Sequence, residues 1–168
     1  MPIVGHGDIA SALTDRYDRL YFASGVSNSQ CTDWHEFQRE KELLMVQNKM
    51  IHLVYFSSLS IYYADTPYTR HKMVMENLVK KNFNTCTIVR IGNITWGKNP
   101  NTFINYLRQR IKRKLHYGFK DEYRYIINKP TFKHWMNLIP EFSNEMNLPG
   151  QMIKPKQLFN ELGITGIL

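Results

Sequence analysis

Pro2-Ile3-Val4-Gly5-His6-Gly7-Asp8-Ile9-Ala10 is the stretch that decides the fold of this chain. A short apolar run, typical of a buried strand, leads into residues 8–17, where apolar side chains recur at helical spacing. Between the two stands the pattern G-x-G-x-x-A, a form of the dinucleotide-binding fingerprint. Gly5 permits a tight turn, Gly7 lets the backbone approach a pyrophosphate, and Ala10 lets the helix pack closely on the strand. The free N–H groups at the start of that helix would face the phosphates, so the stretch predicts a nucleotide-binding strand–turn–helix unit.

Strands and helices continue to alternate through the first half of the chain. Apolar runs predict strands at 19–23, 51–56 and 85–91, and amphipathic segments predict helices at 33–49 and 67–81. The strands are almost wholly apolar, as strands buried on both faces of a sheet are. We therefore expect an α/β fold with a parallel sheet and helices on both of its faces.

The regular alternation of strands and helices ends near residue 97, where glycine, asparagine and proline cluster. Beyond this point the sequence predicts helices at 103–115, 131–142 and 156–162 and a strand at 123–127. We place a domain boundary here, with residues 1–97 as the nucleotide-binding part and residues 98–168 as a small C-terminal cap.

The positive charge of the chain is concentrated in one stretch. The net charge of the 168 residues is +8, and residues 106–134 alone hold nine Lys/Arg against two Asp/Glu, a net charge of +7. Such a stretch suits phosphate, in a nucleic acid or in a small phosphorylated ligand, or it is a solvated helix face. Aromatic residues such as Tyr106 and Tyr123 interleave with the charges, as stacking platforms for bases or as ordinary core residues would.

Composition excludes several other classes of protein. The 43% hydrophobic content excludes a disordered tail, and no run of 18 apolar residues predicts a membrane span. The two cysteines, Cys31 and Cys86, are too few for a disulfide scaffold and too far apart for a metal knuckle. Because the N-terminus carries no basic leader and no long apolar region, we expect a cytoplasmic protein.

Candidate catalytic residues follow the strand at 51–56. Ser57 and Ser58 stand where this strand ends, and the next predicted helix carries Tyr68 and Lys72 at positions i and i+4, which share one face. A nearby ammonium lowers the pKa of a tyrosine, and a tyrosine moved towards neutrality can exchange a proton with a substrate hydroxyl. Tyrosine and lysine also fall at this spacing by chance on many helices.

A third motif, Arg90-Ile91-Gly92-Asn93-Ile94-Thr95-Trp96-Gly97, closes the strand at 85–91. Its backbone and the Asn93 amide could reach a ligand at the carboxyl edge of the sheet, where open α/β folds bind ligands. A plain turn with a capping asparagine would explain the same residues.

Taken together and in this order, the three motifs resemble those of the extended short-chain dehydrogenase/reductase superfamily. Within it they are similar to the NAD-dependent epimerase/dehydratase family, which acts on nucleotide sugars. The resemblance rests on five segments: Gly5-x-Gly7-x-x-Ala10, Ala23-Ser24-Gly25, Ser57-Ser58-Leu59-Ser60-Ile61-Tyr62, Tyr68-x-x-x-Lys72 and Arg90-x-x-Asn93-x-x-x-Gly97. It covers residues 1–97 well and the remainder only in outline.

The resemblance implies a truncated Rossmann-like fold that binds NAD or NADP and a nucleotide-sugar substrate. It implies catalytic roles for three residues: Ser58 as the serine that holds the hydroxyl, Tyr68 as the acid/base, and Lys72 as the residue that holds the nicotinamide ribose. It implies that the cofactor meets Gly5, Gly7, Asp8, Ile9, Ala10, Ala23, Ser24, Tyr68 and Lys72. It implies that the substrate meets Ser58 and Asn93, and we expect Arg108 and Arg113 of the basic stretch to clamp its diphosphate.

The chain departs from the family pattern in two ways. Between Ala10 and Ala23 there is room for one short helix, where the family has two further strand–helix units, one of which carries an acidic residue to the adenine ribose. The second departure is length, because the substrate-binding part has only about 70 residues and the segment between Ser58 and Tyr68 is short. Leu59-Ser60 also replaces the Asp-Glu pair that related dehydratases use for elimination. This replacement favours epimerisation or simple oxidoreduction over dehydration.

Other functions remain open on the sequence alone. The missing adenosine segment favours a non-catalytic nucleotide-binding or assembly module on the same fold, and residues 108–133 leave nucleic-acid binding as a further alternative. The helices at 33–49 and 67–81 correspond to those that form the dimer interface in the resembling family, so we also expect a homodimer.

Overall fold

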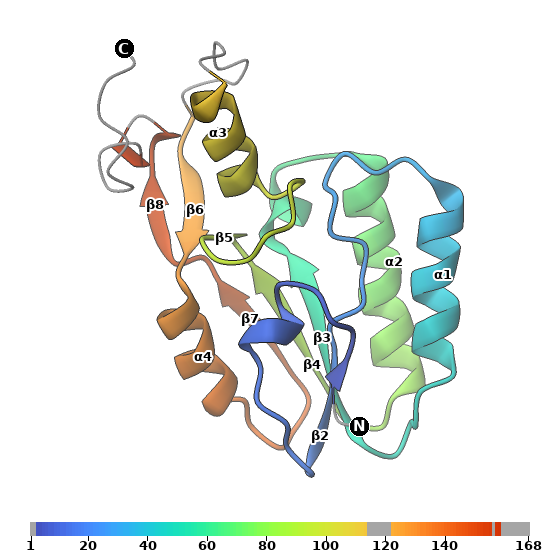
Figure 1. The fold of residues 1–168 in the computed structure, drawn as a ribbon. Coiled ribbons are helices and arrows are strands. Elements are labelled where there is room, and N and C mark those ends of the chain that lie inside the picture. Colours follow the sequence, from blue (N-terminus) through green and yellow to red (C-terminus); the bar gives the residue numbers. More distant parts are fainter. Residues whose placement is uncertain (1–2, 114–121, 156, 159–168) are drawn as a thin grey trace.

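A five-stranded parallel sheet forms the centre of the computed structural model, which describes residues 3–113, 122–155, 157 and 158 (Figure 1). Its strands are β1 (Ile3–Val4), β2 (Arg19–Phe22), β3 (His52–Ser58), β4 (Cys86–Ile91) and β7 (Asn144–Leu148), and they lie side by side in that order. All four strand pairs are parallel. β2, β4 and nearly all of β3 are buried, which is why their sequences are apolar runs rather than alternating ones. The predicted parallel α/β fold is confirmed.

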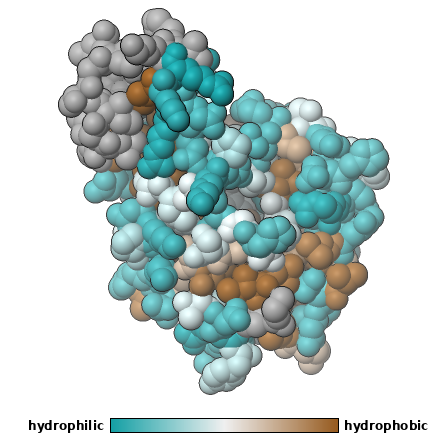
Figure 2. All heavy atoms as spheres, viewed as in Figure 1, coloured by the Kyte–Doolittle hydropathy of each residue, from teal (hydrophilic) through white to brown (hydrophobic). Residues whose placement is uncertain are grey.

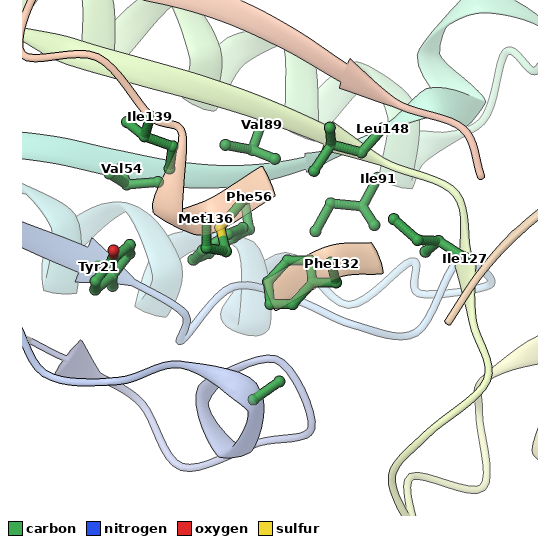
Figure 3. Packing of buried hydrophobic residues seen from close by; sticks show 11 residues of the cluster. Tyr21, Val54, Phe56, Val89, Ile91, Ile127, Phe132, Met136, Ile139 and Leu148 are labelled. Carbon is green, nitrogen blue, oxygen red and sulfur yellow. The ribbon is translucent and has the colours of Figure 1, made fainter. Parts of the chain in front are cut away.

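Helices cover both faces of this sheet. α1 (Trp34–Met45) and α2 (Pro67–Asn82) lie on one face, and α4 (Lys129–Asn137) lies on the other with the three-residue 3₁₀ helix η1 (Ala10–Ala12) (Figure 1). The α4 face buries Phe132 and Met136 of the helix against Phe56 and Ile91 of the strands (Figure 3).

Local sequence explains where the two longest helices begin. The Asp33 carboxylate accepts a hydrogen bond from His35 N and caps α1. Thr66 and Thr69 form a reciprocal capping box at the start of α2, where Pro67 occupies the first turn.

A second, three-stranded sheet lies beyond the carboxyl edge of the first. It consists of β5 (Asn93–Ile94), β6 (Arg124–Ile127) and β8 (Gln151–Ile153), in the order β5-β6-β8. α3 (Phe103–Lys112) packs on it through Ile104 and Leu107. After α4 the chain returns to the first sheet at β7, and β8 then joins the second sheet. The expected division into a nucleotide-binding part (residues 1–97) and a C-terminal cap (residues 98–168) stays a prediction.

Two predicted helices differ from the structure, and three short strands were not predicted. The helix expected over 8–17 is wrong: only η1 forms, and the backbone becomes extended at Leu13. The helix expected over 131–142 is displaced, because α4 ends at Asn137, three residues before Pro140. β5, β7 and β8 were not predicted: β5 and β8 have only two and three residues, and the Asn-Glu-Met-Asn-Leu of β7, at an outer position of the sheet, holds only two apolar side chains. Most of the helix expected at 156–162 lies outside the described residues.

The surface seen in Figure 2 is largely hydrophilic, with apolar side chains gathered around the position of η1 and β1. Ile3 and Val4 of β1 are only partly buried, since β1 has a neighbouring strand on one side alone among the described strands. Within the described ranges, no helix is both long enough and apolar enough to span a bilayer.

Candidate active site

A cleft of about 1090 Å³ opens where the first four strands end. The turns after β1 and β2, the end of β3, the start of α2 and the strand β5 all contribute to its walls. The following predicted site residues line it: Gly7, Asp8, Ile9, Ala23, Ser24, Ser58, Tyr68, Lys72 and Asn93. Topology explains this gathering, because the carboxyl ends of parallel strands meet at one edge of a sheet.

Ser58, Tyr68 and Lys72 all line this cleft. Ser58 ends β3 and caps the 3₁₀ helix η2 (Leu59–Tyr62), where its Oγ accepts a hydrogen bond from Ser60 N at 3.2 Å. Tyr68 and Lys72 are buried one turn apart on α2, and the Lys72 Nζ lies 5.8 Å from the centre of the Tyr68 ring. The Ser58 Oγ also lies 2.8 Å from the Ser60 Oγ.

The pKa of Tyr68 moves in the direction opposite to the expected one. Burial raises it, Lys72 and the hydrogen bond with Ser58 lower it, and the negative charge of Glu40 raises it, with a net result above the ordinary value. Lys72 thus lowers the pKa of Tyr68, as expected, but it does not outweigh the burial of the phenol in the chain by itself. Two features absent from the spacing argument are responsible, namely the burial of the phenol and a carboxylate beside the lysine.

That carboxylate belongs to Glu40 on α1, and sequence reasoning missed it. Lys72 Nζ donates to Glu40 Oε1 at 3.0 Å and to the Tyr55 hydroxyl at 3.1 Å. Glu40 has no exposed surface, and it follows Phe37 by three residues and precedes Leu44 by four, which is the spacing of the buried face of α1. A charged residue on the buried stripe of a helix was the signal available in the sequence.

The two glycines of the turn after β1 have different roles, one in the fold and one at the cleft. Gly5 has a φ of +118°, and a Cβ on it would stand 2.5 Å from the Ala23 carbonyl oxygen. A Cβ on Gly7 would meet nothing within 4 Å, so the backbone there is open to the cleft. Gly5 and Ala10 support the turn without lining the cleft.

Asp8 connects this turn to the loop that follows β5. Its two carboxylate oxygens accept hydrogen bonds from Lys98 N and Asn99 N, each at 3.0 Å. Gly97, with a φ of +94°, leaves the space that this carboxylate fills. Because η1 has only three residues, the pyrophosphate-binding helix N-terminus expected after the fingerprint is not formed, and the exposed backbone at Gly7 is what remains of it.

The arginines at the cleft differ from those expected. Arg39 of α1 and Arg124 of β6 line it, whereas Arg108 and Arg113 do not. Arg124 lies over the Phe103 ring, 5.2 Å from its centre, and Arg39 pairs with Glu36 at 3.1 Å. Arg108 donates to Asn105 Oδ1 within α3, so its substrate role stays a prediction, as does that of Arg113 at the end of this helix. Residues 114–121 of the basic stretch lie outside the described residues.

Neither a protein-family model nor a curated protein matches this sequence. Solved structures share its fold. The enzyme WbmG of Bordetella bronchiseptica, crystallised with NAD and UDP, is 16% identical with a TM-score of 0.63, over 84% of this chain and 53% of WbmG. RMD of Pseudomonas aeruginosa, complexed with NADPH, is 18% identical with a TM-score of 0.55, over 77% of this chain and 54% of RMD.

A third solved structure, of an epimerase, shares the fold. The UDP-N-acetylglucosamine 4-epimerase of Methanobrevibacter ruminantium M1, in complex with UDP-N-acetylmuramic acid, is 14% identical with a TM-score of 0.54, over 80% of this chain and 53% of the epimerase. The chain therefore has the Rossmann-like fold of these enzymes and spans about half of their length.

Proposed function

We propose that this chain is an NAD(P)-dependent nucleotide-sugar epimerase or oxidoreductase of the short-chain dehydrogenase/reductase type. One observation carries the proposal: Ser58, Tyr68 and Lys72 line the same cleft as Gly7 and Asn93, at the carboxyl edge of a parallel sheet. The names of the solved enzymes that share the fold support it, because they include a nucleotide-sugar epimerase and complexes with NAD, NADPH and UDP.

The cofactor fits one end of the cleft better than the other. Gly7 leaves open space beside the backbone where a pyrophosphate would lie, and Tyr68 and Lys72 stand where a nicotinamide ribose would be held. The adenosine end has no strand outside β1 in the described structure, so Ser24, Ser27 and Arg39 would have to form it. NAD or NADP would supply hydride transfer when bound.

In this proposal the protein residues hold the substrate and move its proton. The Ser58 Oγ would bind the reacting sugar hydroxyl, and the Tyr68 oxygen would take up or return its proton. Lys72 would place its ammonium beside both the phenol and the ribose of the cofactor. Asn93, which donates from Nδ2 to the Tyr125 carbonyl oxygen, would hold the edge of the sugar-nucleotide site.

A non-catalytic nucleotide-binding module is the second candidate. The raised pKa of Tyr68 and the ion pair of Lys72 with Glu40 favour it, because a protonated phenol beside an ammonium that is already paired with a carboxylate is a poor base. The module would use the same cleft without turnover.

Calorimetry and turnover assays with three variants separate the two candidates. NAD, NADP and a panel of UDP-sugars should bind, and Gly7→Val should abolish cofactor binding without unfolding the chain. Tyr68→Phe should lower turnover by about 10²- to 10⁴-fold while binding is retained. Tyr106→Phe, at a tyrosine that lines the same cleft, is the matched control and should leave turnover unchanged. Binding without turnover in the unaltered protein would replace the enzyme by the module, and no binding at all would reject both.

A further inference from the structure

A fully buried carboxylate stands behind the proposed catalytic lysine. Glu40 has no exposed surface, and four groups from three other segments surround its two oxygens. Tyr55 OH donates to Oε1 at 2.6 Å and Lys72 Nζ donates to the same oxygen at 3.0 Å. Val26 N donates to Oε2 at 2.7 Å, and the His71 Nε2 lies 3.0 Å from it.

The backbone after β2 covers this carboxylate and the lysine together. A Cβ on Gly25 would stand 2.7 Å from Glu40 Oε1 and 2.7 Å from Lys72 Nζ, so the chain passes directly over the ion pair. The position of Lys72 Nζ is therefore fixed by its hydrogen bonds to Glu40 and Tyr55 and by the backbone of Gly25, which packs against it.

The geometry also limits what the ammonium can offer to the cleft. An ammonium has three N–H donors, and two of those of Lys72 go to Glu40 and Tyr55. The third remains for a group in the cleft, which Lys72 lines. The opposite charge of Glu40 at 3.0 Å also offsets the field that the ammonium exerts on the phenol one turn away.

We propose that Glu40 is a positioning residue, which fixes Lys72 Nζ at the wall of the cleft and withholds part of its positive charge from the phenol of Tyr68. This rests on the proposed function, in which Tyr68 transfers the proton. Glu40 itself touches neither the phenol nor the open part of the cleft, and it acts through Lys72.

Charged, titratable and hydroxyl groups from several elements act on this phenol or on its partners, and Glu76 of α2 acts on its partner Tyr55 in addition to the groups that follow. They are Glu40 on α1, Tyr55 and Ser58 on β3, Tyr63 after η2, and His71 and Lys72 on α2. The pKa of Tyr68 is affected directly by Lys72, Glu40 and Ser58, and Glu40 is the acidic residue of the three. Its negative charge opposes the positive charge of Lys72. Replacing it by a neutral isostere should therefore change the titration of Tyr68 in one defined direction.

Nuclear magnetic resonance of chains labelled with ¹³Cζ-tyrosine tests this without any substrate. Tyr68→Phe assigns the Tyr68 signal. In Glu40→Gln the midpoint of the Tyr68 titration should fall by about one pH unit, which is about ten times more phenolate at a given alkaline pH. Glu42→Gln, which removes a charge from the exposed side of the same helix, should leave the midpoint unchanged. An unchanged midpoint in folded Glu40→Gln would overturn the proposal, because a purely structural carboxylate affects stability alone.

A second variant covers the case in which Glu40→Gln does not fold. Glu40→Asp keeps the charge but withdraws it from Nζ by one methylene group, so the midpoint should fall by a smaller amount. No movement in folded Glu40→Asp would contradict the proposal in that case.

Turnover assays separate this inference from the proposed function. If the enzyme is active, its activity should rise with pH as the Tyr68 phenolate forms. In Glu40→Gln this rise should move to lower pH together with the Tyr68 signal. Absence of turnover with every sugar nucleotide would defeat the proposed function while leaving the resonance shift to stand. Turnover with an unmoved Tyr68 signal would defeat the inference alone.

Discussion

The two glycines of the turn after β1 place different demands on the molecule. Gly5 adopts a positive φ in direct contact with the backbone after β2, whereas Gly7 faces open space. The fingerprint pattern treats both as parts of one binding motif, but the structure assigns Gly5 to the closure of the fold and leaves Gly7 for a ligand.

Alanine at these two positions should therefore have unequal effects on stability. Gly5→Ala should lower the free energy of unfolding by about 2–3 kcal/mol, because a side chain is strained at this φ and meets the Ala23 carbonyl. Gly7→Ala should change it by less than about 0.5 kcal/mol. Urea denaturation of both variants measures the difference, and equal losses would show that the turn is not built as described.

Asp18 provides a pH-dependent contribution at the start of β2. Hydrogen bonds from the guanidinium groups of Arg16 and Arg19 hold the pKa of this carboxyl well below its ordinary value. Arg19 is buried and also donates to the Ile139 carbonyl, so the cluster connects β2 to the segment after α4.

The contribution of Asp18 to stability should disappear in acid. A carboxyl whose pKa is lower in the folded state stabilises the fold above its unfolded pKa of about 4 and loses this effect as the pH falls further. Asp18→Asn should cost about 1 kcal/mol near neutral pH, since part of the side chain is exposed to screening solvent, and much less near about pH 3. Asp15→Asn, at an exposed position nearby, is the control. A loss of equal size at both pH values would contradict the role of the carboxylate.

At the scale of elements, an arginine of β4 joins three segments on the α2 side of the sheet. Arg90 makes two hydrogen bonds to Glu76 of α2, at 3.0 and 2.5 Å, and donates to the Tyr62 hydroxyl of η2 at 2.7 Å. It also pairs with Glu145 of β7 at 2.7 Å. This contact fixes α2, and with it Tyr68 and Lys72, against the strands.

Removing this arginine should destabilise the chain strongly. Arg90→Met leaves Glu76 as a buried carboxylate without its main partner and should cost about 3–5 kcal/mol. Adding Glu76→Gln to the same chain should recover a large part of the loss. Arg70→Met removes an equally close but exposed pair with Asp65 and should have no measurable effect. Denaturation of the three variants decides the matter, and a double variant no more stable than Arg90→Met would show that the unpaired charge is not the cause.

At the scale of the whole molecule, the outer side of α1 and α2 is apolar in part. Trp34 and Met45 on α1 and Met73 and Val74 on α2 are at least 38% exposed. Large exposed apolar groups on neighbouring helices are typical of an interface. The homodimer expected through these two helices stays a prediction, in which these side chains would form the contact.

Sedimentation equilibrium can test that dimer with two methionine variants. Met73→Glu should convert the dimer to a monomer, because it places a charge in the interface. Met152→Glu changes a methionine on β8 that is even more exposed than Met73, and it should leave the dimer intact. A monomeric wild-type chain, or equal effects of both variants, would reject α1 and α2 as the interface.

The sequence by itself determined the parallel sheet and the place of the cleft. Apolar runs such as 86–91 can be satisfied only in strands covered on both faces, and the capping residues Thr66 and Pro67 start α2 so that Tyr68 and Lys72 share one face. These signals act between residues a few positions apart, which is why periodicity and spacing reveal them.

Only the tertiary structure decided how the site is charged. Lys72 and Glu40 are separated by 32 positions, and Tyr55 and Glu40 by 15, so no local pattern announces that they meet. The same holds for the turn after β1, where Asp8 is bound by Lys98 N and Asn99 N, about 90 residues away, and only η1 forms in place of a longer helix. Burial and the charge of a distant carboxylate set the pKa of Tyr68, because the energy of a charge depends on everything packed around it and not on its neighbours along the chain.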